Sequence, residues 1–117
     1  MKWETIEYMK PNGEIPIVDY LQSLPPKHEA KVVRSIQLLE EFGPEIGMPH
    51  VRTLDDGIFE LRTKFSSNIF RSLFFHWYDN KLVLTHGFTK KTQKTPTQEI
   101  DRAKRYREDF IQRKGDK

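Results

Sequence analysis

The chain has 117 residues, of which 32% are charged and 36% are hydrophobic, and its formal net charge is +3. This length suits one hydrophobic core, so we expect a single domain spanning residues 1–117. No apolar run approaches the roughly 20 residues of a membrane span, and the absence of cysteine excludes disulfides and thiolate metal sites. Glu4 and Glu7 stand where a signal peptide needs apolar residues, so we expect a cytoplasmic protein without a membrane partner.

Charge is distributed unevenly along the chain. Residues 1–61 carry six Lys and Arg against eleven Asp and Glu, a net charge of −5. Residues 62–117 carry fourteen against six, a net charge of +8. This asymmetry indicates two different partners, one of them polyanionic, although oppositely charged solvated helix faces would give the same pattern.

The first half of the chain predicts a strand followed by two helices. Residues 3–8 mix aromatic and β-branched residues, which favours a short strand, and the turn residues 10–13 end it. A short helix is predicted over 16–24 and a second over 26–42, because apolar residues recur at helical spacing. The proline pair at 25–26 separates them, so we expect a helical hairpin that covers one side of a sheet.

Three strands and a last helix follow. Residues 58–65 alternate between apolar and polar, residues 69–78 are apolar on both faces, and residues 82–88 form a third strand after a tight turn. Consecutive hairpins predict that the three strands are antiparallel neighbours. Thr95-Pro96-Thr97-Gln98 indicates a capping box that starts the final helix. The pattern predicts an α+β fold with a small, mainly antiparallel sheet of about four strands.

Cationic residues cluster around this predicted sheet. Strand alternation places Arg62 and Lys64 on the same face as Glu60, and Arg71 lies within an otherwise apolar strand. One interpretation is that Arg71 forms a structural salt bridge with Glu60 or a helix acid, and the other is that it binds an anion. If the strands lie in order, these cations gather at one end of the sheet with those that follow the third strand, Lys90, Lys91 and Lys94.

His86 is a possible proton carrier beside this loop. Its alternation places it with Leu82, Leu84 and Phe88 on one face, which favours a satisfied core histidine. Phe88 is a candidate for stacking on a base, although a position in the core is the alternative.

These residues resemble the RelE/HigB-type toxins of bacterial type II toxin–antitoxin systems, and in particular their HigB-like, phage-associated branch. The resemblance is carried by residues 57–62, 70–75, 84–96 and 99–103, with the pattern His86-Gly87-Phe88 followed by Lys90-Lys91 and Thr95-Pro96. It implies a RelE-like fold and a ribosome-dependent mRNA endonuclease that inhibits translation without a cofactor or metal. It also implies a HigA-like helix-turn-helix antitoxin as partner, with operator DNA contacted only through that antitoxin.

The resemblance also assigns residue roles. The implied catalytic residues are Arg62, Lys64, Arg71, Lys90 and Lys91, and the expected RNA-binding residues are Lys94, Thr92, Phe88 and Arg102. Members that place a tyrosine after the last strand have no counterpart here, where Thr92, Gln93 and Thr95 stand, so the general acid and base stay open. Two alternatives also stay open: a toxin of this fold acting on a target such as DNA gyrase, and a non-catalytic nucleic-acid-binding or corepressor module.

Overall fold

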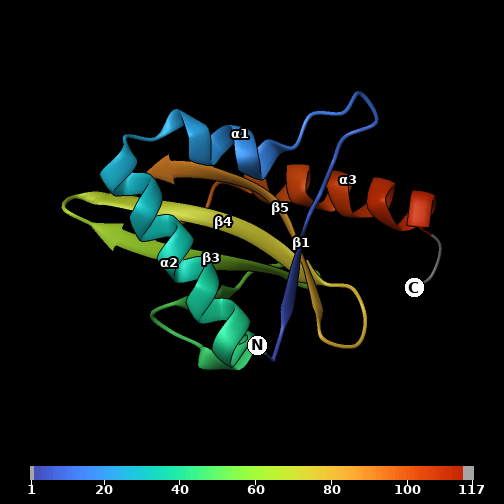
Figure 1. The fold of residues 1–117 in the computed structure, drawn as a ribbon, viewed down its shortest axis with the longest axis horizontal. Coiled ribbons are helices and arrows are strands. Elements are labelled where there is room, and N and C mark those ends of the chain that lie inside the picture. The colour runs from blue at the N-terminus through green and yellow to red at the C-terminus, as the bar shows by residue number, and fades with distance from the viewer. Residues whose placement is uncertain (1, 115–117) are drawn as a thin grey trace.

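The computed structural model, drawn as a ribbon in Figure 1, describes residues 2–114. Its elements follow the hydrophobic patterns of the sequence. In chain order they are β1 (Glu4–Glu7), α1 (Pro16–Ser23), α2 (Pro26–Phe42), the 3₁₀ turn η1 (Pro44–Ile46), β2 (Val51–Thr53), β3 (Ile58–Phe65), β4 (Asn68–His76), β5 (Lys81–Lys90) and α3 (Thr97–Lys114). The predicted α+β class is confirmed.

The five strands form one mixed sheet in the order β1-β5-β4-β3-β2. The antiparallel pairing of β3, β4 and β5 is confirmed, β2 pairs antiparallel with β3, and β1 pairs parallel with β5. The strand that the sequence did not predict is β2, three residues long and at the edge of the sheet beside β3.

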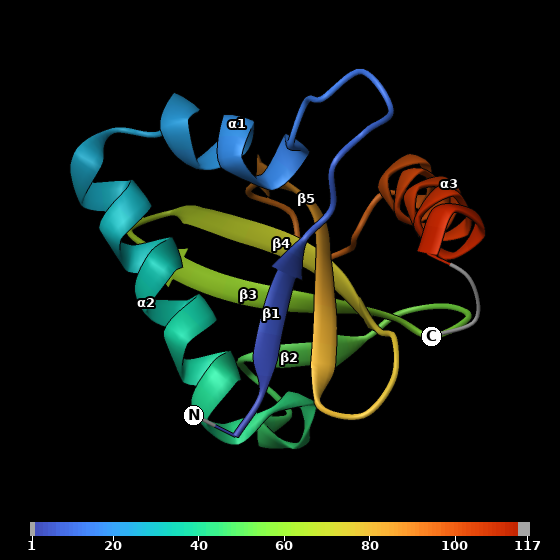
Figure 2. The same ribbon diagram turned by 45° about the vertical axis from the view of Figure 1, so that its right-hand side comes forward.

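Helices cover both faces of the sheet (Figure 2). The predicted hairpin of α1 and α2 packs on one face, where Ile17 and Leu39 join buried residues of the strands. Gly43 ends α2 with a φ of 75°, a conformation that favours glycine. A Cβ at this position would also overlap the Trp3 indole, so the glycine lets β1 lie against the end of α2.

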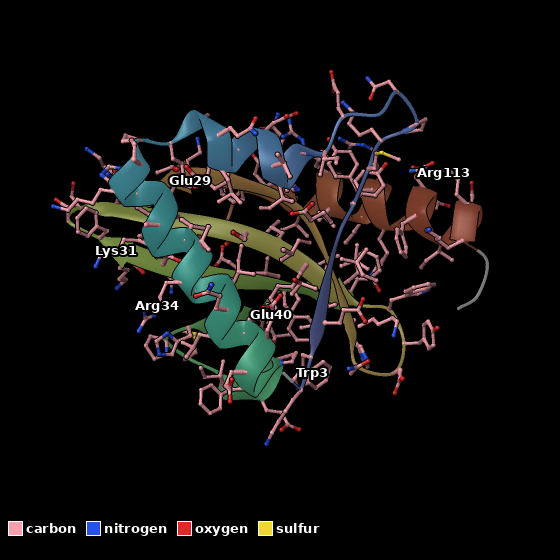
Figure 3. All side chains as sticks on the ribbon, viewed as in Figure 1. Trp3, Glu29, Lys31, Arg34, Glu40 and Arg113 are labelled. Carbon is pink, nitrogen blue, oxygen red and sulfur yellow. The ribbon has the colours of Figure 1, made fainter. Side chains whose placement is uncertain are left out.

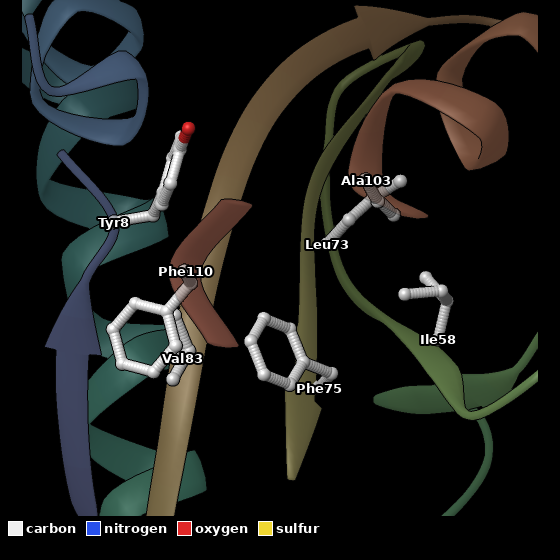
Figure 4. Close-up of a cluster of buried hydrophobic side chains, with 7 residues drawn as sticks. All are labelled: Tyr8, Ile58, Leu73, Phe75, Val83, Ala103 and Phe110. Atoms are coloured by element: carbon white, nitrogen blue, oxygen red, sulfur yellow. The ribbon is translucent and has the colours of Figure 1, made fainter. Parts of the chain in front are cut away.

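The final helix α3 packs on the opposite face. Phe110 and Ala103 of α3 lie on Leu73 and Phe75 of β4, as Figure 4 shows. The Phe110 ring meets the ring of Phe75 edge to face, with 5.9 Å between their centroids. Because α3 covers only part of this face, the sheet beyond its N-terminus is left for the chain segment that connects β5 to α3.

A β-bulge in β5 changes which face its side chains occupy. Leu73 pairs with His86 but the next residue, Phe74, pairs with Leu84, so Thr85 is an extra residue in β5. Leu82 and Leu84 therefore face the helical hairpin, whereas His86 and Phe88 face α3. The prediction that these four residues share one face is wrong, because the inserted residue reverses the alternation after Leu84.

Candidate functional site

The face of the sheet beyond the N-terminus of α3 carries most of the predicted cations. Directly paired residues on neighbouring strands point to the same face, so the register of β3, β4 and β5 defines three rows of side chains. These rows are Lys64–Ile69–Lys90 at the end of the sheet, Arg62–Arg71–Phe88 next, and Glu60–Leu73–His86 nearest to α3. The convergence of Arg62, Lys64 and Arg71 with Lys90 is therefore a result of strand register.

Arg71 lies completely buried beside an equally buried carboxylate. Both Arg71 and Glu60 are 0% exposed, and Nη1 of Arg71 lies 3.3 Å from Oε2 of Glu60. Arg62 shares this carboxylate, with 3.5 Å between its Nε and Oε1 of Glu60. Burial lowers the pKa of Arg71, and the Glu60 carboxylate opposes that shift. Of the two interpretations of Arg71, a structural salt bridge or an anion-binding group, the salt bridge with Glu60 is present in the structure.

The loop of residues 91–94 lies over these arginines. Arg71 donates to the carbonyl oxygens of Thr92 and Gln93, the latter at 3.3 Å. Arg62 donates from Nη2 to the side-chain Oε1 of Gln93 at 2.8 Å, and Arg52 of β2 donates from Nη1 to the Gln93 carbonyl at 2.9 Å. Three arginines from three adjacent strands thus converge on one exposed residue of the loop.

Thr95 fixes the end of this loop to the sheet. Its side chain is buried, with its hydroxyl donating to Oε2 of Glu60 and accepting from Nη1 of Arg71 at 3.0 Å. The helix begins at Thr97, so the Thr95 hydroxyl serves the buried ion pair and not the helix terminus. The predicted capping box at Thr95 is therefore wrong, because the hydroxyl points toward Glu60.

The lysines of the site are placed differently from its arginines. Lys64 is the next-to-last residue of β3 and Lys90 is the last residue of β5, on the two strands that flank β4, and Lys91 and Lys94 lie on the loop. All four are exposed, and within residues 2–114 none of them forms an ion pair. With strands about 4.8 Å apart, the backbones of Lys64 and Lys90 lie roughly 10 Å from one another across β4. These side chains are the freely accessible part of the positive charge.

The other predicted RNA-binding residues do not all join this group. Thr92 is exposed on the loop, and Phe88 is half-buried against the α3 core. Arg102 lies away from the row, on the first turns of α3, where it pairs with Glu99 at 3.7 Å. It lines a separate hollow of about 330 Å³ together with Tyr20 and His86.

His86 is buried between β5 and α3, as the core interpretation predicts, although on the other face from Leu82. Its Nε2 lies 3.0 Å from Oε1 of Glu99, and its Nδ1 lies 3.1 Å from the Thr85 hydroxyl. Burial lowers the pKa of His86 to about 4, and the hydrogen bond with Glu99 only partly opposes this shift. The imidazole is therefore neutral at pH 7 and joins α3 to the sheet.

Sequence reasoning gave no role in the site to three of its residues, namely Arg52, Gln93 and Thr95. It did name Glu60 as a possible partner of Arg71, and the alternation of β3 puts Glu60 on the face of the arginines as predicted. The role of Arg52 depends on β2, and that of Gln93 on the path of the loop. Among the residues that the structure describes, no three His, Asp or Glu side chains are grouped to hold a metal ion. Within residues 2–114, none of the helices has the length and apolar character that crossing a membrane requires.

Comparisons with known proteins agree with this architecture. The family model described as "Phage derived protein Gp49-like (DUF891)" matches residues 19–108, which include every strand except β1 and all of the site. The crystal structure of an archaeal RelE–RelB complex from Pyrococcus horikoshii OT3 contains a chain that matches with a TM-score of 0.51 and 16% identity. That match covers 80% of this chain and 100% of the other, and it shows a shared fold. No curated protein matches the sequence.

Proposed function

Because the chain belongs to the Gp49-like phage-derived protein family, which is of the RelE/HigB toxin type, we propose that it is a ribosome-dependent mRNA endonuclease. In this proposal the protein is the toxin of a type II toxin–antitoxin system and inhibits translation by cleaving mRNA in the cytoplasm. A HigA-like helix-turn-helix protein is its antitoxin and carries the complex to operator DNA.

One observation carries this proposal: lysines from two strands and the following loop lie exposed at one sheet face and form no ion pair with any residue from 2 to 114. Lys64, Lys90, Lys91 and Lys94 are exposed, and Arg62 lies in the adjacent row. Single-stranded RNA binds to surfaces that combine such charges with an aromatic platform, and Phe88 supplies that platform in the second row.

The chemistry that we propose is attack by a ribose 2′-hydroxyl on the adjacent phosphate. Charge then develops on the phosphate oxygens and on the leaving 5′-oxygen, and fixed cations stabilise it most where water is excluded. Arg62 and Arg71 are the groups that we assign to the reacting phosphate, because a guanidinium donates two parallel hydrogen bonds to it. Lys64, Lys90 and Lys91 hold the flanking phosphates, and Thr92, Lys94 and Arg102 extend the RNA contact.

The test compares two pairs of exposed cations on opposite faces of the sheet. The double variant Lys64→Ala/Lys90→Ala removes two charges from the proposed RNA surface. The control Lys31→Ala/Arg34→Ala removes two exposed charges from α2 on the other face, which Figure 3 labels. With purified ribosomes and a defined mRNA, we expect the first variant to cleave at least about tenfold more slowly, because each lysine that binds a phosphate strengthens the bound state. The control should cleave as the wild type does.

Other outcomes would point to the alternative functions. Intact mRNA together with impaired DNA supercoiling would replace the ribonuclease proposal with a gyrase-directed toxin. Intact mRNA and undiminished growth, with nucleic-acid binding retained, would support a non-catalytic binding module. Thermal unfolding of each variant must be measured alongside, so that a loss of folding is not mistaken for a loss of activity.

A further inference from the structure

The arginines under the loop carry more positive charge than the protein neutralises. Arg52, Arg62 and Arg71 all contact residues 92–95, and Glu60 is the one carboxylate among their side-chain contacts in the described chain. Three positive charges against one negative charge leave an excess beneath a loop that itself carries lysines. Arg52 is half-buried, whereas Arg62 and Arg71 are buried, and buried charge is normally paired or bound to an ion.

Neutral oxygen atoms of the loop accept hydrogen bonds from these arginines. Gln93 supplies its carbonyl oxygen to Arg52 and Arg71, and its side-chain oxygen to Arg62. Hydrogen-bonding capacity still remains: Nε of Arg71 is buried without a hydrogen-bond partner, and Nε of Arg62, which lies 3.5 Å from Oε1 of Glu60, also forms no hydrogen bond. The side chains that carry these atoms are only 4% and 0% exposed, so solvent does not readily satisfy them.

The covering segment is short and has a definite boundary on each side. Lys90 is the last residue of β5, and Thr95 is buried and held by Glu60 and Arg71. The four residues between them, 91–94, are exposed. Residues 91–94 can therefore move away from the arginines while Thr95 keeps α3 and the buried ion pair in place.

We propose that the three arginines form a phosphate-binding site that Gln93 occupies in the free protein and that a phosphodiester takes over when RNA binds. The two non-bridging oxygens of the phosphodiester would replace the two oxygens of Gln93 as hydrogen-bond acceptors. Hydrogen bonds between a guanidinium and an anionic oxygen are roughly twice as strong as those to neutral acceptors, so the exchange is favoured when RNA is present. The identity of the ligand as RNA rests on the proposed function, whereas the displacement of Gln93 by an anionic phosphate does not.

Two opposite substitutions of the same residue test this inference. Gln93→Ala removes the side-chain oxygen on Arg62 and should tighten anion binding about tenfold, the scale of one charge-assisted hydrogen bond. Gln93→Glu puts a carboxylate on Arg62 and should weaken binding by about the same factor. The matched control is Gln37→Ala, an exposed glutamine on α2 at the other face of the sheet, which should leave the affinity unchanged.

The probes are a short RNA oligonucleotide with a 2′-O-methyl group at every ribose, which cannot be cleaved, and inorganic phosphate. Affinity is measured by titration, and the Nε–H resonances of Arg62 and Arg71 are followed by NMR. We expect both resonances to shift when either probe binds, together with faster amide exchange in residues 91–94. Binding of the oligonucleotide but not of phosphate, with the same response of the two variants, would still support the site and assign it to a polymer.

Weaker binding in both Gln93 variants would overturn the inference, because it would make Gln93 a residue that positions the loop for RNA. Unchanged affinity in both would overturn it as well. The result is independent of catalysis, since neither probe reacts. If the Gln93 variants behave as expected but ribosome-bound mRNA stays intact, the phosphate site stands and the proposed endonuclease function fails.

Discussion

The two faces of the sheet are built on different physical principles. Under the helical hairpin, buried apolar side chains such as Ile17, Leu39 and Phe74 form the core. The buried polar strand residues of this face are neutral, and one of them, Thr63, is bonded to Ser35 at 2.7 Å. Under α3 and the 91–94 loop, an apolar cluster adjoins the buried Glu60 and Arg71. The packing of the hairpin face depends on the shapes of its apolar side chains, whereas the packing of the α3 face also depends on the pairing of buried charges.

This difference indicates where the protein gives up stability for function. Replacing a buried ion pair by apolar residues of similar volume is often neutral or stabilising, so a fold does not need such a pair for its own sake. The hairpin face shows that this sequence can build a largely apolar layer on the same strands. The ionic face is therefore the one that we expect selection for phosphate binding to have shaped.

The largest expected effect comes from breaking the charge pairing. Glu60→Ala leaves Arg71 and Arg62 buried without their carboxylate, and we expect a loss of about 3–5 kcal/mol in the free energy of unfolding, measured by urea denaturation. Thr63→Val is the matched control on the same strand and the opposite face, with an expected loss of about 1 kcal/mol. Equal losses in the two variants would remove the distinction between the faces.

A smaller effect is expected from overpacking the hairpin face. The Tyr20 ring of α1 lies against Gly87 of β5, and a Cβ at position 87 would overlap that ring. Gly87→Ala should therefore lower the free energy of unfolding by about 1–3 kcal/mol and release the bond of 2.7 Å between the Tyr20 and Thr89 hydroxyls. Denaturation and the phenol resonances of Tyr20 report both changes. An unaltered Tyr20 environment would show that this face is less tightly packed than its contacts imply.

A third expected effect is a pH dependence on the α3 face, which develops gradually as the pH is lowered. Because burial holds the pKa of His86 near 4 while the unfolded chain titrates near its ordinary value of 6.5, the unfolded state binds the extra proton between these values. The stabilisation is complete above pH 6.5 and is lost as the pH falls toward 4, by up to about 1.4 kcal/mol per pH unit. Denaturation series at several pH values measure this slope, and in His86→Gln it should flatten. A slope that His86→Gln leaves unchanged would assign the titration to another group.

Local sequence signals determined most of the fold. The helix at 26–42 and the strand at 58–65 have the predicted bounds, because Pro25-Pro26 and Gly43 mark the helix ends and strict alternation marks the strand. The gathering of Arg62, Lys64, Arg71 and Lys90 also follows from strand order and alternation. These features depend on residues close together in the chain.

The features that were not predicted depend on contacts between distant segments. The three residues of β2 become a strand only through pairing with β3, and the bulge at Thr85 has no local signature of its own. Likewise, nothing in residues 91–94 indicates that Gln93 meets three arginines from β2, β3 and β4. The accessibility of the arginines, which decides how the site works, was for this reason outside the reach of the sequence.

The bulge at Thr85 has a consequence for aligning and engineering proteins of this type. If side chains are assigned to alternate faces from Leu82 onward without regard to the bulge, Lys90 falls on the face of the helical hairpin, which is wrong. If the alternation is started again at Gly87, after the bulge, Lys90 falls on the α3 face, where it lies. If Thr85 were paired regularly and not bulged, the same sequence would present its basic strand end to the helical hairpin. A graft of this strand into another scaffold should therefore keep the bulge at Thr85, or leave that residue out where the new strand pairs regularly.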